Sequence, residues 1–330
     1  MRIAITGFSG YLGSALMKAL SQRENITLVG YDSLIFNHLD PSSLTLNNNV
    51  NIFIGDILDK QALLSAFLDC DIVVHLAALV GDKYCDMYPE AAQKVNIEGT
   101  RNVIEAAIQS NVRRVIFSST CSVYGVSGAN AKELLTENSP LNPVSLYAET
   151  KLLAEKEVQN LCSEHDISVT ILRLATAFGV SPFTRFDLLV NSIASSIADT
   201  LQTELYGIES YRPYVSVTNI VDIIFHIIDH SEHYRGFQIL NAGFTENNFT
   251  KRELGALILG RYPETEIIFG SHGNDPRNYC VDFSILESKL MGTINVVHPI
   301  EGLTEVMESI SSGTICRTFI KTDRANRGHC

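Results

Sequence analysis

Tyr147 and Lys151 are the residues best suited to chemistry, because they lie four positions apart in a segment whose pattern predicts a helix from Ser145 onward. This spacing puts both side chains on one face of the helix. A phenol is a poor base at neutral pH, but a nearby ammonium group lowers its pKa toward the range that general-base catalysis requires. Thr120 ends a predicted strand and supplies a hydroxyl that can orient the same substrate oxygen. We therefore predict Thr120, Tyr147 and Lys151 as catalytic residues.

A glycine-rich turn lies at the N-terminus, where a predicted strand at residues 2–6 runs into Gly7, Gly10 and Gly13. The first glycine allows a sharp turn, the second leaves room for a pyrophosphate, and the third lets the following helix pack close to the strand. Free N–H groups at the start of that helix attract anionic oxygens. The spacing G-x-x-G-x-x-G between a strand and a helix therefore predicts a dinucleotide-binding site.

Asp32 follows the second predicted strand, residues 27–31, about twenty residues after the glycines. A carboxylate at this position accepts hydrogen bonds from both hydroxyl groups of the adenosine ribose, and it repels a 2′-phosphate. No arginine stands in the two positions after it. The sequence therefore favours NAD over NADP as the cofactor.

Two other polar residues have alternative interpretations. Asp56 follows a predicted strand at residues 51–54, and its carboxylate either meets the adenine amino group or caps the helix predicted at residues 60–68. His75 lies within an apolar run at residues 72–76. In such a run a packed, hydrogen-bonded histidine is favoured over a catalytic one.

Strands and helices alternate through residues 1–174, which predicts an α/β fold with a doubly wound parallel sheet. The remaining strands of this part are predicted at residues 114–117 and 168–173, and a long helix is predicted at residues 88–110. Ligands of such sheets bind beyond the carboxyl ends of the strands. Each motif described above falls at that edge.

Beyond residue 174 the alternation becomes irregular. Helices are predicted at residues 186–198, 222–230, 254–259 and 303–310, and strands at 214–217, 238–240 and 266–269, of which 238–240 can extend the main sheet. We predict a cofactor-binding Rossmann domain at residues 1–174 and 213–242 and a smaller substrate-binding lobe at 175–212 and 243–310. The tail at 311–330 has little apolar periodicity, which is compatible with disorder.

Composition limits the class of protein. The chain has 330 residues, of which 45% are hydrophobic and 19% charged, and no run approaches the ~18 apolar residues of a membrane span. The N-terminus enters a strand without a signal segment, so we expect a cytoplasmic protein. A net charge of −12 argues against nucleic acid as a partner, and an anionic ligand must be held by a few local cations. The seven cysteines include no C-x-x-C pair, so neither disulfides nor a zinc site is indicated.

Taken together, the motifs resemble those of the extended short-chain dehydrogenase/reductase family, which comprises nucleotide-sugar epimerases and dehydratases. The resemblance covers residues 1–310. The motifs that carry it are Gly7-x-x-Gly10-Tyr-Leu-Gly13, Asp32, Gly55-Asp56-Ile57, His75-Leu-Ala-Ala78, Asn96, Ser118-Ser-Thr-Cys-Ser-Val-Tyr-Gly125, Tyr147-x-x-x-Lys151 and Tyr211-Arg-Pro-Tyr-Val215. It implies a Rossmann domain with a sugar-nucleotide lobe, and a homodimer formed through a four-helix bundle that includes the Tyr147 helix.

The resemblance also implies ligand contacts. The expected NAD contacts are Gly7, Gly10, Tyr11, Leu12, Gly13, Asp32, Asp56, Ile57, Leu76, Ala77, Ala78, Asn96, Tyr147 and Lys151, the last through the nicotinamide ribose. The expected contacts of a nucleotide-diphosphate sugar are Val80, Gly81, Thr120, Ser122, Thr176, Arg185, Asn191, Arg212 and Arg277. Arg212 matches an arginine that grips the diphosphate, and Arg277 matches a second phosphate or ribose contact, in keeping with the bidentate geometry of guanidinium groups.

Departures from the family pattern narrow the reaction. The 4,6-dehydratases carry an Asp-Glu pair after the catalytic threonine, whereas this chain has Cys121 and Ser122, so 4,6-dehydration is not expected. Thr176 stands where many members have asparagine. Residues 76–82 and 185–191 look most like a bacterial surface-polysaccharide branch that includes GDP-heptose 4-dehydrogenases and epimerases.

Three hypotheses follow. The first is an epimerase that oxidises C4 of a nucleotide-linked sugar to a 4-keto intermediate and reduces it on the other face. The second is a net 4-dehydrogenase, and the third, from another class, is a catalytically silent NAD-sensing protein.

His226 and His230 lie one helical turn apart, but no glutamate stands between them as in H-E-x-x-H, so an incidental pair is favoured over a metal site.

Overall fold

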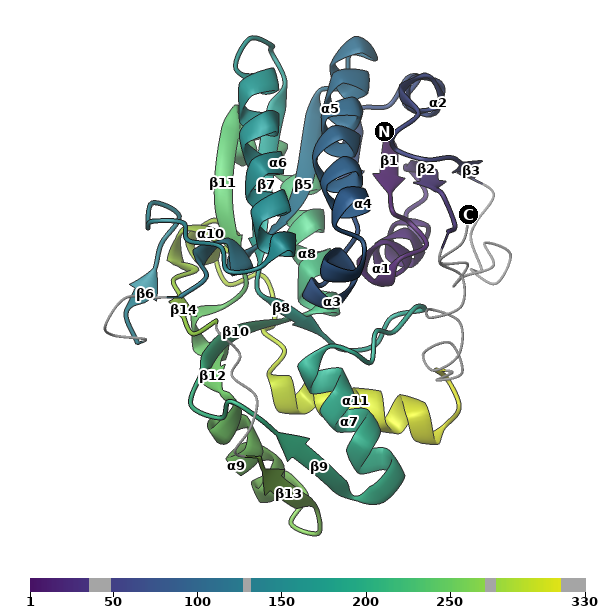
Figure 1. Cartoon of the computed structure of the whole chain (residues 1–330). Coiled ribbons are helices and arrows are strands. Elements are labelled where there is room, and N and C mark those ends of the chain that lie inside the picture. Colours follow the sequence, from purple (N-terminus) through teal and green to yellow (C-terminus); the bar gives the residue numbers. More distant parts are fainter. Residues whose placement is uncertain (36–48, 127–131, 271–276, 316–330) are drawn as a thin grey trace.

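The computed structural model describes residues 1–35, 49–126, 132–270 and 277–315, and a seven-stranded sheet forms its larger half (Figure 1). The strands are β1 (Arg2–Thr6), β2 (Thr27–Asp32), β3 (Val50–Ile54), β4 (Ile72–His75), β5 (Arg114–Thr120), β7 (Ser168–Leu174) and β11 (Phe237–Ala242). Their order is β11-β7-β5-β4-β1-β2-β3, and all neighbours are parallel. The predicted doubly wound sheet is confirmed, and the segment predicted at 238–240 does extend it.

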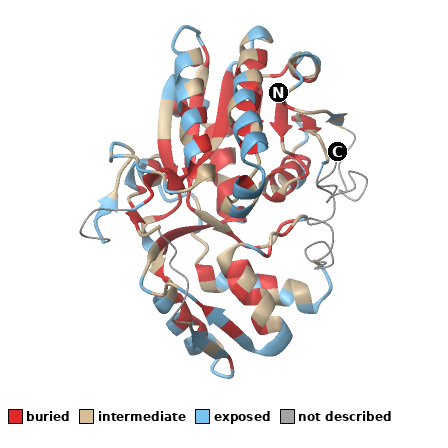
Figure 2. Cartoon of the chain, viewed as in Figure 1, coloured by how far each residue is buried: buried red, intermediate tan, exposed pale blue. Residues whose placement is uncertain are grey.

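Helices cover both faces of this sheet. α1 (Tyr11–Leu20), α8 (Val217–Asp229) and α10 (Ser284–Leu290) share one apolar core with Ile3 and Ile5. α2 (Lys60–Ala66), α5 (Thr100–Gln109) and α6 (Leu146–Cys162) share another core with Ala4. Successive strand residues face opposite sides, so a strand covered on both faces must be apolar throughout. Figure 2 shows mostly buried strands in the middle of the sheet, whereas β3 at its edge has no buried residue.

The strand order reverses between β1 and β4, which places the predicted ligand crevice at their carboxyl ends. β1 runs into the glycine turn and β4 into residues 76–81, while β5 ends at Thr120. Two short helices, α3 (Asp82–Met87) and α4 (Pro89–Gln93), follow β4 and pack against α6. The motifs therefore meet at one edge although they are far apart in the sequence.

A smaller lobe fills the lower half of Figure 1. Its strands form a sheet of β12 (Asn248–Thr250), β10 (Tyr211–Ser216) and β8 (Thr176–Phe178) and a pair of β13 (Glu266–Phe269) and β9 (Gln202–Leu205). A further pair, β14 (Cys280–Val281) and β6 (Leu134–Leu135), packs on the core of the main sheet through Val281 and Leu135. The helices of the lobe are α7 (Leu189–Thr200), α9 (Lys251–Arg261) and α11 (Pro299–Ser311). Phe178, Leu205 and Tyr214 lie in its own apolar core.

Three predicted elements are corrected. The helix predicted at residues 88–110 consists of α4, a π-helical segment (Lys94–Gly99) and α5, and apolar spacing alone does not reveal such a wider turn. Asp56 does not cap α2, because the N-cap is Asp59, whose carboxylate accepts hydrogen bonds from Gln61 N and Ala62 N. The adenine contact of Asp56 stays a prediction.

The third correction concerns Val217, which was predicted to end a strand but begins α8. The side chain of Ser216 accepts a hydrogen bond from Asn219 N and starts the helix there. Near the C-terminus α11 extends to Ser311, and most of the predicted tail, residues 316–330, lies outside the described residues. Among the helices of the described ranges, none is long and apolar enough to cross a membrane.

Candidate active site

The glycine turn after β1 has the shape that a dinucleotide requires. Gly7 has φ +75°, and a Cβ there would lie 2.7 Å from Ala77 N. A Cβ on Gly13 would lie 2.0 Å from the Gly7 carbonyl oxygen, so helix α1 can approach only because this position is glycine. A Cβ on Gly10 would meet that oxygen alone, at 3.2 Å, and its other side is open for a phosphate.

The carboxylate of Asp32 is held beside this turn. Its Oδ2 accepts a hydrogen bond from Ser9 N at 3.1 Å and its Oδ1 accepts one from Leu34 N at 2.9 Å. Asp56 is fixed in a similar way, with Oδ1 accepting from Leu58 N at 2.9 Å. The turn and the fixed carboxylate at the end of β2 fit the adenosine and pyrophosphate of a dinucleotide.

The segment after β4 is fixed by Asn96, which was predicted to contact the cofactor. The Asn96 Oδ1 accepts from Leu79 N at 2.7 Å, and its Nδ2 donates to the Leu79 carbonyl and to Thr150 Oγ1, both at 3.0 Å. Asn96 is fully buried. Its amide therefore ties residues 76–81, which include Leu76, Ala77 and Ala78, to helix α6, a supporting role that the sequence did not indicate.

His75 is a packed histidine, as the sequence favoured. Its Nδ1 shares a hydrogen bond with Thr6 Oγ1 at 2.7 Å and its Nε2 shares one with Thr100 Oγ1 at 3.0 Å. Complete burial lowers its pKa to about 3, and the Lys151 charge adds to this effect. His75 is therefore neutral and joins β1, β4 and α5.

The three predicted catalytic residues stand at the carboxyl edge of the sheet. Thr120 ends β5, where its Oγ1 accepts a hydrogen bond from Ser122 N at 3.1 Å. Tyr147 lies half-buried in the first turn of α6, and Lys151 lies one turn further on, with Nζ 4.2 Å from the Phe117 ring centroid. Within the described ranges, the Tyr147 hydroxyl and the Lys151 ammonium make no hydrogen bond, so both can bind ligands.

Burial and charge set the protonation of this pair. Burial raises the pKa of Tyr147, while the charges of Arg185 and Arg277 lower it and those of Cys85 and Asp82 raise it further. Burial lowers the pKa of Lys151 to about 7, and Glu155 and Cys85 act in the opposite direction. Tyr147 is therefore a neutral phenol in the free protein, and Lys151 titrates close to neutral pH.

A buried ion pair supports the helix that carries Tyr147 and Lys151. Glu155, one turn after Lys151, accepts from Arg173 Nη2 at 2.8 Å and from Arg173 Nε at 3.1 Å, and it also accepts a hydrogen bond from Ser119. Both charged side chains are nearly inaccessible, at 4% and 3% exposed. Arg173 Nη1 donates to the Tyr124 hydroxyl at 3.1 Å. This network fixes α6 against β5 and β7, and sequence analysis missed it.

Three predicted substrate-binding arginines approach the same edge. Arg185 is held by Asp187 through Nε at 3.0 Å and Nη2 at 2.6 Å, and its Nη2 would lie 3.5 Å from a Cβ on Gly81. Arg277 forms an ion pair with Asp82, with Nη1 to Oδ2 at 3.0 Å. Arg212 is buried and donates to the Tyr279 hydroxyl at 3.1 Å.

Arg212 and Arg277 come to one wall because residues 277–279 run beside the start of β10. Tyr211 N donates to Asn278 Oδ1 at 2.9 Å, and Tyr279 N donates to the Tyr211 carbonyl at 3.2 Å. The other predicted substrate contacts come from three separate segments, of which Gly81 approaches Arg185 and Thr176 pairs with Tyr214 of β10. They are Val80 and Gly81 before α3, Ser122 after β5 and Thr176 in β8.

Asn191 and Tyr11 are buried and hydrogen-bonded to each other. Asn191 is fully buried, its Oδ1 accepts from Gly179 N at 2.8 Å, and its Nδ2 donates to the Tyr11 hydroxyl at 3.1 Å and to the Arg185 carbonyl at 2.9 Å. The Tyr11 hydroxyl donates to the Gly179 carbonyl at 2.7 Å. These bonds join the cofactor-side helix α1 to the segment that carries Arg185, and the ligand contacts of Tyr11 and Asn191 stay predictions.

The pair His226 and His230 does not form a metal site among the described residues. The Nδ1 of His226 shares a hydrogen bond with the Tyr234 hydroxyl at 2.9 Å, and its ring stacks on His230 at a centroid distance of 4.1 Å. In the part of the chain that the structure describes, no three His, Cys, Asp or Glu side chains are placed to share a metal ion.

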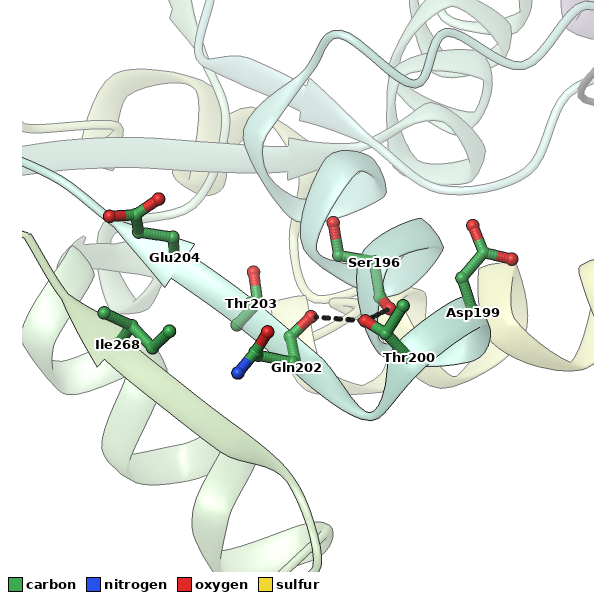
Figure 3. Close-up of a pocket in the computed structure, with 7 residues that line it drawn as sticks. All are labelled: Ser196, Asp199, Thr200, Gln202, Thr203, Glu204 and Ile268. Atoms are coloured by element: carbon green, nitrogen blue, oxygen red, sulfur yellow. Dashed lines mark hydrogen bonds between the residues drawn. The ribbon is translucent and has the colours of Figure 1, made fainter.

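Figure 3 shows a cavity of about 260 Å³ between α7, β9 and β13. Its lining residues are Ser196, Asp199, Thr200, Gln202, Thr203, Glu204 and Ile268. Two carboxylates and no cation line it, so it does not suit a diphosphate. It is also separate from Tyr147, and we place the candidate active site at the edge of the main sheet.

Known protein families account for this arrangement. The model of the NAD dependent epimerase/dehydratase family matches residues 3–243. The chain belongs to this family. NAD is therefore the cofactor of its family, which agrees with the fit of the glycine turn and Asp32.

The sequence identity to individual members of the family is low. The chain is 30% identical over 208 residues to a UDP-glucose 4-epimerase of Bacillus subtilis, covering 60% of this chain and 59% of that protein. It is 25% identical over 293 residues to a dTDP-glucose 4,6-dehydratase of Mycolicibacterium smegmatis, covering 88% and 87%. The first match thus spans little more than half the length of the relative.

Solved structures show the same fold. The UDP-glucuronic acid 4-epimerase of Bacillus cereus, solved with UDP-glucuronic acid and NAD, superposes with a TM-score of 0.80 at 22% identity, covering 94% of this chain and 99% of that one. The UDP-glucose 4-epimerase of Thermotoga maritima, solved with UDP-glucose, gives 0.79 at 23% identity, covering 96% and 100%.

The buried ammonium of Lys151 leads to a stability prediction. Its pKa of about 7 in the folded protein lies below its value in the unfolded chain, so folding is penalised most at or below pH 7 and less as pH rises toward the ordinary lysine range. Lys151→Met removes this penalty. We expect it to raise the free energy of unfolding at pH 7 by about 2 to 4 kcal/mol.

Urea unfolding of cofactor-free protein measures this effect. The gain of the Lys151→Met variant over wild type should shrink between pH 7 and pH 9, while its activity is lost. A variant less stable than wild type at pH 7, or a gain that does not change with pH, would contradict the assignment of a destabilised ammonium.

Proposed function

We propose that this protein is an NAD-dependent oxidoreductase that acts at C4 of a nucleotide-linked sugar and works as a 4-epimerase. The observation that carries the proposal is the Tyr147 hydroxyl, which has no hydrogen-bond partner among the described side chains and backbone. The charges of Arg185 and Arg277 lower the pKa of this hydroxyl, and Lys151 lies one helical turn away. A general base with arginines on the substrate side suits a hydroxyl of an anionic nucleotide sugar.

Gly7, Gly10 and Asp32 would hold the cofactor, and Lys151 would bind its nicotinamide ribose. Bound NAD supplies the redox chemistry, since its nicotinamide takes up a hydride from carbon and can return it. In this scheme residues 1–174 and 213–242 bind NAD, and residues 175–212 and 243–310 bind the nucleotide sugar. The packing of α8 and β11 on the main sheet supports that division.

Tyr147 accepts the proton of the sugar hydroxyl at its phenolate oxygen and returns it when the sugar is reduced. Burial favours the neutral phenol, so the cations around it must stabilise the phenolate. Arg185 and Arg277 do this from the substrate side, and Lys151 would do so from the cofactor side. Thr120, fixed at the end of β5, would orient the same hydroxyl.

The residues after Thr120 favour epimerisation over 4,6-dehydration. Elimination of water needs an acid and a base next to the sugar, but Cys121 is buried and its thiol donates to the Arg173 carbonyl at 3.0 Å. Burial raises the pKa of this thiol, so it stays protonated and is not a base. The hydroxyl of Ser122 is likewise neither an acid nor a base of the required strength. The second candidate is a net 4-dehydrogenase, which uses the same residues and releases the 4-keto sugar.

A panel of UDP-, GDP- and CDP-sugars tests the proposal. The purified protein is assayed first for bound NAD(H) and then for conversion of each sugar nucleotide. Recovery of the C4 stereoisomer supports the epimerase, and an accumulating 4-keto sugar with NADH supports the dehydrogenase. A 4-keto-6-deoxy product would contradict the argument from Cys121, and binding of NAD without any turnover would favour a sensing protein.

The proposal includes a homodimer joined through α6, where Leu153 is 46% exposed although it is apolar. Light scattering of the purified chain measures the molar mass directly. A mass equal to one chain at micromolar concentration would contradict the dimer.

A further inference from the structure

Asp82 is a carboxylate at the candidate sugar site that neither sequence motifs nor family resemblance assigned. It is the first residue of α3, directly after Gly81, and α3 packs against the Tyr147 helix. Its Oδ2 holds Arg277 at 3.0 Å. Arg185 Nη2 would lie 3.5 Å from a Cβ on the neighbouring Gly81, so Asp82, Arg277 and Arg185 lie close together beside the helix that carries Tyr147.

The second oxygen of Asp82 has no hydrogen-bond partner among the described residues. Oδ1 is buried from solvent and accepts no hydrogen bond within residues 1–35, 49–126, 132–270 and 277–315. A buried carboxylate oxygen without a donor costs free energy, and such atoms are rare in folded proteins. An ionised carboxylate can only accept, so the missing partner must be a donor. The hydroxyl groups of a sugar are donors of this kind.

The surrounding charges balance. Arg277 is paired with Asp82, and Arg185 is paired with Asp187 through two hydrogen bonds. Among the described residues, the two arginines nearest to Gly81 and Asp82 are therefore each paired with a carboxylate. A negatively charged sugar at this position would be repelled by the Asp82 carboxylate, and Arg277 and Arg185 are already engaged by Asp82 and Asp187.

We propose that Asp82 is a specificity-determining residue, whose Oδ2 holds Arg277 and whose Oδ1 accepts a hydrogen bond from a hydroxyl group of a neutral bound sugar. The inference rests on the proposed function, because it assumes that the site takes a nucleotide sugar. It deepens that function by selecting neutral sugars over uronic acids, which carry a carboxylate on the sugar ring.

A competing explanation is that Asp82 only positions Arg277. The two explanations differ in what they predict for pairs of ligands with the same base. If Asp82 only positions Arg277, Asp82→Asn and Arg277→Gln must weaken neutral and uronic sugars by the same factor. If Asp82 binds the sugar, Asp82→Asn must lower the ratio of neutral to uronic affinity, whereas Arg277→Gln, which removes a cation, must not lower it.

Binding is best measured in a Tyr147→Phe background, where turnover does not interfere. The ligand pairs are UDP-glucose with UDP-glucuronic acid and GDP-mannose with GDP-mannuronic acid, titrated calorimetrically into the NAD-loaded full chain. Asp86→Asn is the matched control, since Asp86 is an exposed carboxylate on the same short helix. Melting temperature and NAD content show whether each variant is folded.

With Asp82 present, the neutral ligand should bind at least about tenfold more tightly than its uronic counterpart, the effect expected of one charge-assisted hydrogen bond and one repulsion. Asp82→Asn should reduce this ratio by about tenfold, and Asp86→Asn should leave it unchanged. An unchanged ratio in Asp82→Asn, or equal affinities when Asp82 is present, would overturn the inference. Failure of both ligand pairs to bind while NAD is retained would overturn the proposed function and the inference together.

Discussion

Replacing Tyr147 by phenylalanine is expected to lower turnover by about 10³-fold while changing the affinity for NAD and the nucleotide sugar by less than about threefold. The substitution removes only the hydroxyl, which bonds to none of the described residues. The ring keeps its place in the first turn of α6. Loss of the proton acceptor therefore affects the chemical step alone.

Steady-state kinetics on the substrate found in the sugar panel, together with calorimetric binding, measure both quantities. Tyr88→Phe is the matched control, because Tyr88 is 36% exposed at the start of α4 and should retain full turnover. A Tyr147→Phe enzyme within tenfold of wild type would refute Tyr147 as the general base. A comparable loss in the control would show that the assay reports folding instead.

Replacing Arg173 by methionine is expected to lower the free energy of unfolding by about 3 to 5 kcal/mol. The change leaves the Glu155 carboxylate buried without its counter-ion, and it removes the donor to the Tyr124 hydroxyl. A charge stranded in the interior costs far more than the ion pair contributes when intact. Because Glu155 follows Lys151 by one turn, the variant should also weaken catalysis.

A double-mutant cycle in urea separates the stranded charge from lost packing. Adding Glu155→Gln to Arg173→Met should recover part of the loss, since a neutral amide replaces the unpaired carboxylate. Arg23→Met is the control, because Arg23 pairs with Asp229 through two similar hydrogen bonds at the surface and should cost less than about 1 kcal/mol. Equal losses in the two arginine variants would contradict the account.

Much of the fold was predictable because the signals for it are local. The strands of the main sheet are short and rich in apolar residues, and a run such as residues 72–74, apolar at every position, indicates a strand covered on both faces. Boundaries were less predictable where two local tendencies compete. Val217 is a β-branched residue after a strand, yet the capping hydroxyl of Ser216 begins a helix there.

The positions of the candidate site residues followed from the sequence more readily than their partners did. Tyr147 and Lys151 lie on α6 as predicted, and Thr120 ends β5. Asn96 and Asn191 were expected to bind ligands, but their amides hydrogen-bond within the protein. A sequence shows that an amide is present, whereas its partners depend on chain segments far away in the sequence.

The sequence by itself determined the glycine turn, the carboxylate of Asp32 and the four-residue spacing of Tyr147 and Lys151, because each depends on a single stretch of chain with fixed local geometry. Only the tertiary structure decided that Asp82 faces Arg277 and that Glu155 is buried against Arg173. Both pairs join residues from separate elements, and the Glu155–Arg173 pair is also buried. The tertiary structure thus sets the charge around Tyr147.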